Sequence, residues 1–268
     1  MQLPFFVRQL QLAMASMVVA GIMTWVSASA ADSCNGTVYL TIDTGSMSQV
    51  KTIADTLNHY QVKATFFMAN EKTVNGDYSL DPGWADYWKA RVAEGHAFGT
   101  HTFDHVYIRR DAANGHVIVK PQFGEQAGKE VEWSAAQYCS ELKRVDYRFK
   151  QLTGQGIGPI WRAPGGKLSP NLLAAGQTCG FAHVGWAPAG FLGDELPSES
   201  YPNDVLINKA ITNIKAGDIL MMHLGIWSRK DPFAPHLGEL IVGLKQRGLC
   251  FDTLKHHPDY QAAFAKAS

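Results

Sequence analysis

Short apolar runs alternate along this chain with segments in which apolar residues recur every three or four positions. Residues 37–42 are β-branched and aromatic, a composition typical of a strand, and the run ends at Asp43. Apolar residues then recur at helical spacing over residues 50–57, and a second strand is predicted at residues 64–68. The chain therefore opens with a strand, a helix and a second strand.

The same alternation continues toward the end of the chain. Further helices are predicted at residues 85–94, 134–152, 170–178, 205–214 and 235–247, and further strands at residues 96–100, 160–162, 181–186, 218–223 and 249–253. Residues 106–133 have no clear period and contain several glycines, so we expect a long surface excursion that can wall a cleft. His256 and His257 are expected in a solvated polar tail.

About seven alternations of strand and helix imply a parallel sheet. Over this length one barrel-like α/β domain is more economical than two domains, because the sequence has no linker-like run and no internal repeat. In barrels of this kind the carboxyl ends of the strands carry the chemistry.

The first thirty residues have a different character. Arg8 precedes an apolar run over residues 10–26 that contains no acidic residue, and small residues follow at 28–30. We expect a secretory signal peptide at residues 1–30 and a catalytic domain at residues 31–268, which would make the protein secreted or periplasmic. The alternative is an uncleaved membrane anchor, because the apolar run approaches spanning length.

Composition narrows the possible partners. The chain has 268 residues, of which 46% are hydrophobic and 18% charged, as expected for a globular protein with a sizeable core. Its 24 basic residues balance 24 acidic ones, so it lacks the excess of Lys and Arg that marks nucleic-acid-binding proteins. We therefore expect no nucleic-acid partner. We also expect a monomer.

Four cysteines lie beyond the expected cleavage point, and no two of them have CxxC spacing. An even number in an exported chain favours disulfides over metal thiolates, and four cysteines allow three connectivities. We expect Cys34–Cys250 together with Cys139–Cys179, because the first pair lies at the entries of the first and last predicted strands. Four buried thiols are the alternative.

Polar and ionisable side chains stand at the ends of several predicted strands. They are Asp43, the pair His101 and His105, Arg162, Trp186 and His223. Taken singly, each has an ordinary explanation, since Asp43 can cap the following helix and His223 can be a core histidine. Such groups are costly to bury unless they pair or bind something, so their recurrence at strand ends indicates a shared site, with the two histidines as metal ligands.

Four motifs in this order resemble the polysaccharide deacetylases, the NodB-like family 4 of carbohydrate esterases. They are Thr-Ile-Asp-Thr-Gly at 41–45, His-Thr-Phe-Asp-His at 101–105, Arg-Ala-Pro-Gly-Gly at 162–166 and Leu-Met-Met-His at 220–223. The resemblance implies a NodB homology domain, a distorted and incomplete (β/α) barrel of about seven parallel strands. It also implies a metal-dependent hydrolase that removes acetyl groups from N-acetylated glycans such as peptidoglycan or chitin-like oligosaccharides.

The resemblance assigns a role to each strand-end residue. His101 and His105 would bind a divalent metal, often Zn²⁺ in the family, with Co²⁺ or another ion also possible. Asp43 would be the general base toward the attacking water. Arg162 would hold Asp43 charged and oriented, and His223 would protonate the leaving amine.

Further residues would shape the substrate groove. The backbone N–H of Gly165 would stabilise the oxyanion, at a position where many relatives have tyrosine. Trp186 and Trp227 would stack on sugar rings, with the alternative that they are ordinary core or wall aromatics near strand ends. The family supplies an aspartate partner for the catalytic histidine near Trp186, and here only Asp194 or Glu195 is available to replace it.

Thr44 is the main departure from the family pattern. The family usually has two adjacent aspartates here, the first as base and the second as third metal ligand, whereas this chain has Asp43 followed by Thr44. A neutral hydroxyl is a poor ligand, so we expect lower metal affinity, with either water filling the gap or Asp43 turning to the metal. The alternative function is a catalytically weakened or inactive glycan-binding relative.

Overall fold

The computed structural model describes Met1 and residues 34–267. The signal peptide expected at residues 1–30 therefore lies, apart from Met1, outside the described residues. Within the described part of the chain, no helix combines the length and apolar character that crossing a membrane requires.

A seven-stranded parallel sheet forms the centre of the fold, which confirms the expected α/β architecture. Its strands are β1 (Gly36–Asp43), β2 (Thr65–Met68), β3 (Ala97–Thr100), β7 (Ile160–Trp161), β8 (Ala182–His183), β9 (Ile219–His223) and β10 (Leu249–Phe251). The order is β10-β1-β2-β3-β7-β8, and β9 pairs with β1 beyond the point where β10 ends. Strands β8 and β10 stand at opposite ends of this order, which fits an incomplete barrel.

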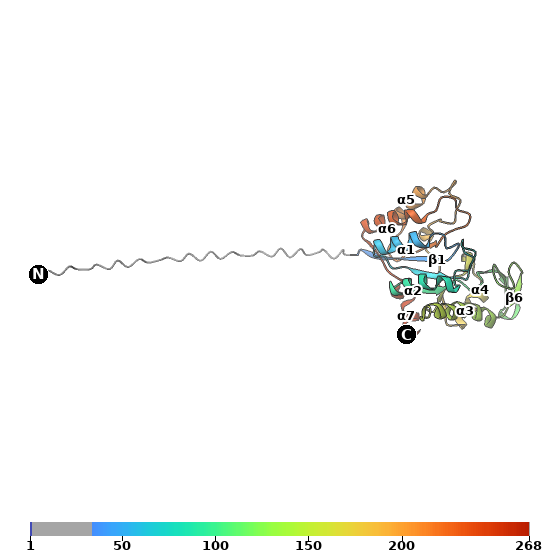
Figure 1. The fold of residues 1–268 in the computed structure, drawn as a ribbon. Helices are drawn as coiled ribbons and strands as arrows, with labels where there is room; N and C mark the ends of the chain where they lie inside the picture. The colour runs from blue at the N-terminus through green and yellow to red at the C-terminus, as the bar shows by residue number, and fades with distance from the viewer. Residues whose placement is uncertain (2–33, 268) are drawn as a thin grey trace. The chain divides into compact units, whose positions relative to one another are not determined.

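Helices surround this sheet. They are α1 (Val50–His59), α2 (Ala85–Ala93), α3 (Ala135–Thr153), α4 (Pro170–Thr178), α5 (Asn203–Asn213), α6 (Leu237–Gln246) and α7 (Gln261–Ala267). Figure 1 shows β1 running between the group α1, α5 and α6 and the group α2, α3 and α4. The long helix α3 begins at a capping box between Ser134 and Gln137 and ends at the left-handed Gly154.

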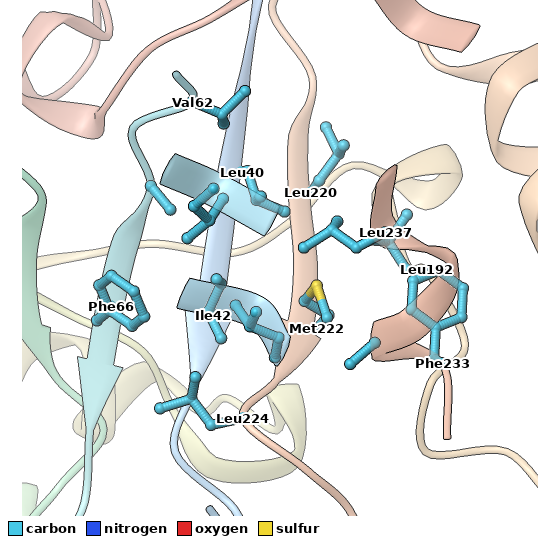
Figure 2. Packing of buried hydrophobic residues seen from close by; sticks show 14 of the residues in the cluster. Leu40, Ile42, Val62, Phe66, Leu192, Leu220, Met222, Leu224, Phe233 and Leu237 are labelled. Carbon is cyan, nitrogen blue, oxygen red and sulfur yellow. The ribbon is translucent and has the colours of Figure 1, made fainter. Parts of the chain in front are cut away.

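The alternating side chains of β1 explain where the site lies. Leu40 and Ile42 point into the main apolar core, and Figure 2 shows them between Phe66 of β2 and the β9 residues Leu220 and Met222. Successive side chains of a strand point to opposite faces, so Asp43 points away from this core. The face that carries Asp43 is the one on which the site is built.

Residues 106–133 differ from the expected irregular excursion. They form a three-stranded antiparallel sheet of β4 (Val106–Asp111), β5 (Val117–Pro121) and β6 (Val131–Trp133). Its alternating buried residues belong to a second apolar cluster with side chains of α3 and α4. The alternation was missed because each strand is short and the first contains a bulge. This sheet does wall the cleft, through Tyr107.

The C-terminal tail and the cysteines tie the domain together. The expectation of a solvated tail is wrong for His257, which is buried against the Tyr39 ring, because the chain folds back through a 3₁₀ turn into α7. Disulfides join Cys34 to Cys250 and Cys139 to Cys179, the two pairs expected from the sequence. The first bond joins the entries of β1 and β10, and the second joins α3 to the end of α4.

Candidate active site

The carboxyl ends of the central strands open onto a cavity of about 270 Å³. Its walls include seven of the residues predicted from the sequence, namely Asp43, His101, His105, Gly165, Trp186, His223 and Trp227. Arg162 lies directly behind Asp43, and Thr44 is buried beside the cavity. Parallel register explains this convergence, since β1, β2, β3 and β9 all end at the same edge.

Asp43 and Arg162 form an ion pair at the base of the cavity. Both side chains are buried, and Arg162 Nη1 donates to Asp43 Oδ1 at 2.8 Å. The guanidinium also donates to the carbonyl oxygens of Val184 and Gly185, each at 3.3 Å. Burial by itself would raise the pKa of Asp43, but the charge of Arg162, and then that of the neighbouring histidines, lowers it below the ordinary value. Asp43 is therefore a charged and oriented carboxylate.

His101 is held as a neutral imidazole. Its Nδ1 donates to the backbone oxygen of Arg162 at 3.0 Å, which leaves the lone pair on Nε2. This Nε2 lies 3.7 Å from Asp43 Oδ2, and the His105 ring is 5.0 Å from the His101 ring between centroids. Burial is the main cause that lowers the pKa of His101 to about 4. Such a ring is ready to bind a metal or to accept a hydrogen bond.

The pKa of His223 is shifted in the direction opposite to that of His101. Its Nδ1 lies 3.1 Å from Asp194 Oδ1, and its backbone N–H donates to Asp194 Oδ2 at 2.7 Å. Glu195 stands farther away, with Oε2 3.7 Å from His223 Nε2. Burial would lower the pKa of His223, but the charge and hydrogen bond of Asp194, helped by Asp43 and Glu195, raise it to about 9. Of the two carboxylates that the sequence left open, Asp194 is the one bonded to the imidazole.

Glu71 is the cavity residue that sequence reasoning missed. Its Oε1 accepts hydrogen bonds from the Thr44 hydroxyl and, at 2.8 Å, from the Gly45 N–H. Burial would raise the pKa of Glu71, but the charge of His105 and these two hydrogen bonds lower it. A signal was present in the sequence, because Glu71 follows the strand at residues 64–68 and so obeys the same strand-end rule as Asp43.

Gly165 stands beside an aromatic ring that replaces the missing side chain. Its backbone has a positive φ of 64°, and a Cβ atom at this position would lie 2.7 Å from Cε1 of Tyr107. The Tyr107 ring comes from β4 and lines the same cavity. The groove wall is therefore occupied, although the residue at position 165 has no side chain.

The two tryptophans lie on the cavity wall in different settings. Trp186 packs near the guanidinium of Arg162, 5.4 Å from ring centroid to Cζ. Trp227 lies in the loop after β9 and is 63% exposed. An exposed indole beside a polar cavity offers a flat apolar face of the kind on which sugar rings stack.

The side chains that line the cavity include ligand types suited to a divalent metal. His101 presents an unprotonated Nε2, His105 lies beside it, and Glu71 adds a carboxylate, which are the ligand types that zinc prefers. Within residues 34–267, no three His, Cys, Asp or Glu side chains lie in an arrangement that could hold a metal ion as it stands. We expect binding of an ion to draw these side chains together.

Comparisons with known proteins agree with this geometry. A family model described as polysaccharide deacetylase matches residues 30–184. A chitooligosaccharide deacetylase of Azorhizobium caulinodans is 27% identical over 81% of this chain and 92% of its own length. A family 4 acetyl xylan esterase from Clostridium thermocellum in complex with cobalt superposes with a TM-score of 0.62 at 20% identity, covering 84% of this chain and 92% of that one. A family 4 pseudoenzyme from Bacillus anthracis superposes with a TM-score of 0.60 at 18% identity, covering 83% and 65% respectively.

Proposed function

This chain belongs to the polysaccharide deacetylase family, and on that premise we propose that it is a metal-dependent hydrolase of an extracytoplasmic N-acetylated glycan, peptidoglycan or a chitin-like oligosaccharide. The reaction breaks the amide C–N bond of the acetamido group and releases acetate and a free amine. One observation carries the proposal. The charged Asp43 lines the cavity beside His223, its register partner on β9, whose pKa is raised, and His101 and His105 line the same cavity.

The metal is proposed to be Zn²⁺, with Co²⁺ or another divalent ion as an alternative. His101 and His105 hold it, and when bound it supplies Lewis-acid polarisation of the acetyl carbonyl and activation of a water molecule. The protein itself supplies the base. Asp43 accepts the proton of the attacking water, and Arg162 keeps this carboxylate ionised and pointed at the cavity by their 2.8 Å hydrogen bond.

The remaining steps use Gly165 and His223, which also line the cavity. As the carbonyl carbon becomes tetrahedral, the Gly165 N–H donates to the developing oxyanion. His223 then transfers its proton to the leaving nitrogen, and Asp194 stabilises the charged imidazole before that transfer. Trp186 and Trp227 are proposed to contact the neighbouring sugar rings.

The two disulfides support a location for the protein outside the cytoplasm. Two disulfides are typical of proteins that work in an oxidising space, which favours a secreted or periplasmic enzyme. The signal peptide proposed at residues 1–30 would deliver the domain there, with membrane attachment only if that segment stays uncleaved. We propose a monomer.

Acetate release tests the proposed activity directly. The purified mature domain, loaded with Zn²⁺ or Co²⁺, should release acetate from N-acetylglucosamine oligomers or from peptidoglycan, and a chelator should abolish the release. Enzyme-coupled acetate measurement and mass spectrometry of the oligomers, in which each lost acetyl group changes the mass, give two independent readouts. No acetate from either substrate class with any divalent metal would contradict the proposal.

A glycan-binding relative without turnover is the second candidate. It is favoured by Thr44, which replaces a carboxylate of the family pattern, and a structurally similar family 4 protein is itself described as a pseudoenzyme. This function predicts that the protein binds N-acetylglucosamine oligomers but leaves them acetylated under every metal. Calorimetric sugar binding combined with the acetate measurement separates the two functions.

The pH profile should report the Asp194–His223 pair. The acid form of His223 persists up to its pKa of about 9, so kcat/KM should fall as the pH rises through this value. Asp194→Asn removes the charge that raises the pKa, and the alkaline limb should then move down by about 1 pH unit or more. Glu199→Gln, an exposed carboxylate in the same loop, is the control that should leave the limb in place. An unchanged limb in Asp194→Asn would show that His223 is not the acid.

A further inference from the structure

Two loops at the mouth of the sheet are joined by backbone hydrogen bonds. The His101 N–H donates to the Met68 carbonyl at 2.8 Å, and the Asn70 N–H donates to the Phe103 carbonyl at 2.7 Å. Strands β2 and β3, which lead into these loops, pair in parallel up to their last residues. The loop that carries Glu71 is thereby fixed beside the loop that carries both cavity histidines.

The Glu71 carboxylate is held by one of its two oxygens. Within residues 34–267, the two hydrogen bonds to this side chain both fall on Oε1, one from the Thr44 hydroxyl and one from the Gly45 N–H. Oε2 therefore keeps its lone pairs for a ligand. Glu71 lines the same cavity as His101 and His105, so a donor set of two imidazoles and one carboxylate faces a common space.

The Thr44 hydroxyl is engaged away from the cavity. It gives its only proton to Glu71 and accepts the Ala69 N–H at 3.1 Å. The side chain is 1% exposed and is absent from the cavity walls. Thr44 is thus placed to orient the carboxylate of Glu71 and is poorly placed to bind an ion itself.

We propose that Glu71 is the third protein ligand of the metal, beside His101 and His105, and that Thr44 and the Gly45 N–H position it. This inference rests on the metal dependence in the proposed function. Catalytic zinc sites usually have three protein ligands and one open position, and the two histidines alone fall one short. With Glu71 as the third ligand, Asp43 keeps its bond to Arg162 and stays free to act as base.

Metal affinity, measured without substrate, tests the assignment. Zn²⁺ binding to the chelator-stripped protein is measured by competition with a chromophoric chelator. Glu71→Gln should weaken binding by about 100-fold or more, since even the loss of a partner outside the ligand set costs about 10–100-fold. Glu195→Gln is the matched control, because it removes a carboxylate from the same cavity on the His223 side and should change affinity less than about 3-fold.

Three variants separate ligation from simple charge attraction. Glu71→Asp keeps the charge but shortens the side chain, so it should also bind weakly if direct ligation matters. Thr44→Val removes the hydroxyl that orients Glu71 and should weaken binding by about 10-fold. Thr44→Ser keeps the hydroxyl that donates to Glu71, so it is the matched control for Thr44→Val and should bind with nearly wild-type affinity. The visible absorption spectrum of the Co²⁺ form should change in Glu71→Gln and stay unchanged in Glu195→Gln.

The outcomes distinguish this assignment from the function on which it rests. Wild-type protein that binds Zn²⁺ tightly, with Glu71→Gln binding equally well, would overturn the role of Glu71 while leaving a metal-dependent deacetylase intact. Full affinity in Glu71→Asp with loss only in Glu71→Gln would reduce Glu71 to a nearby charge and overturn direct ligation. Wild-type protein that binds no divalent ion would overturn both proposals.

Discussion

Asp43→Asn is expected to lower kcat/KM for glycan deacetylation by ~10²–10⁴-fold, because it removes the carboxylate that Arg162 holds charged at the cavity floor. Asparagine has nearly the same shape and can still accept from Arg162, so the fold should survive. The change therefore isolates proton acceptance from packing. The measurement is acetate release from N-acetylglucosamine oligomers at saturating Zn²⁺ or Co²⁺.

Two controls make this result specific. The Zn²⁺ affinity of Asp43→Asn should stay close to that of the wild type, since we assign the carboxylate ligand to Glu71. Asp55→Asn changes an exposed aspartate of α1 that pairs with the exposed Lys51, and it should retain full activity. Equal activity of Asp43→Asn and wild type would rule out Asp43 as the base. Loss of metal together with activity would instead make Asp43 a ligand.

Arg162→Met should lower the free energy of unfolding at pH 7 by about 3–5 kcal/mol, because it leaves the Asp43 carboxylate buried without its partner. The three hydrogen bonds of the guanidinium are lost together, including those to the oxygens of Val184 and Gly185. Urea denaturation with the metal-free protein measures the effect without a contribution from bound ion.

The double variant shows whether the cost comes from the uncompensated charge. Adding Asp43→Asn to Arg162→Met should recover a large part of the lost stability, whereas simple additivity of the two changes would contradict the ion-pair explanation.

The free energy of unfolding should also depend on pH in a defined direction. In the wild type the pKa of Asp43 is lowered, so its contribution is present at neutral pH and is lost as the pH falls through the folded-state pKa. In Arg162→Met the carboxyl protonates at a higher pH, so the stability difference between the two proteins should shrink as the pH is lowered.

Much of the fold could be predicted from local patterns. Strand composition, helical periodicity and the Ser134 and Gly154 helix ends depend on residues close together in the chain, and these set the strand-helix alternation. The antiparallel sheet of β4, β5 and β6 was missed because its strands are only three to six residues long. Segments that short carry too few alternating positions for a period to stand out.

Part of the candidate site could also be predicted from the sequence, and part required the tertiary structure. By itself the sequence determined that Asp43, His101 and His223 share one edge, because they stand where three strands of a parallel sheet end and such ends converge. Only the tertiary structure decided which carboxylate serves which group, with Asp194 on His223 and Glu71 on Thr44. These partners come from loops that have no period and join residues 27 to 29 positions apart. Their pairing is fixed by how the loops pack, and no local pattern in the chain records that packing.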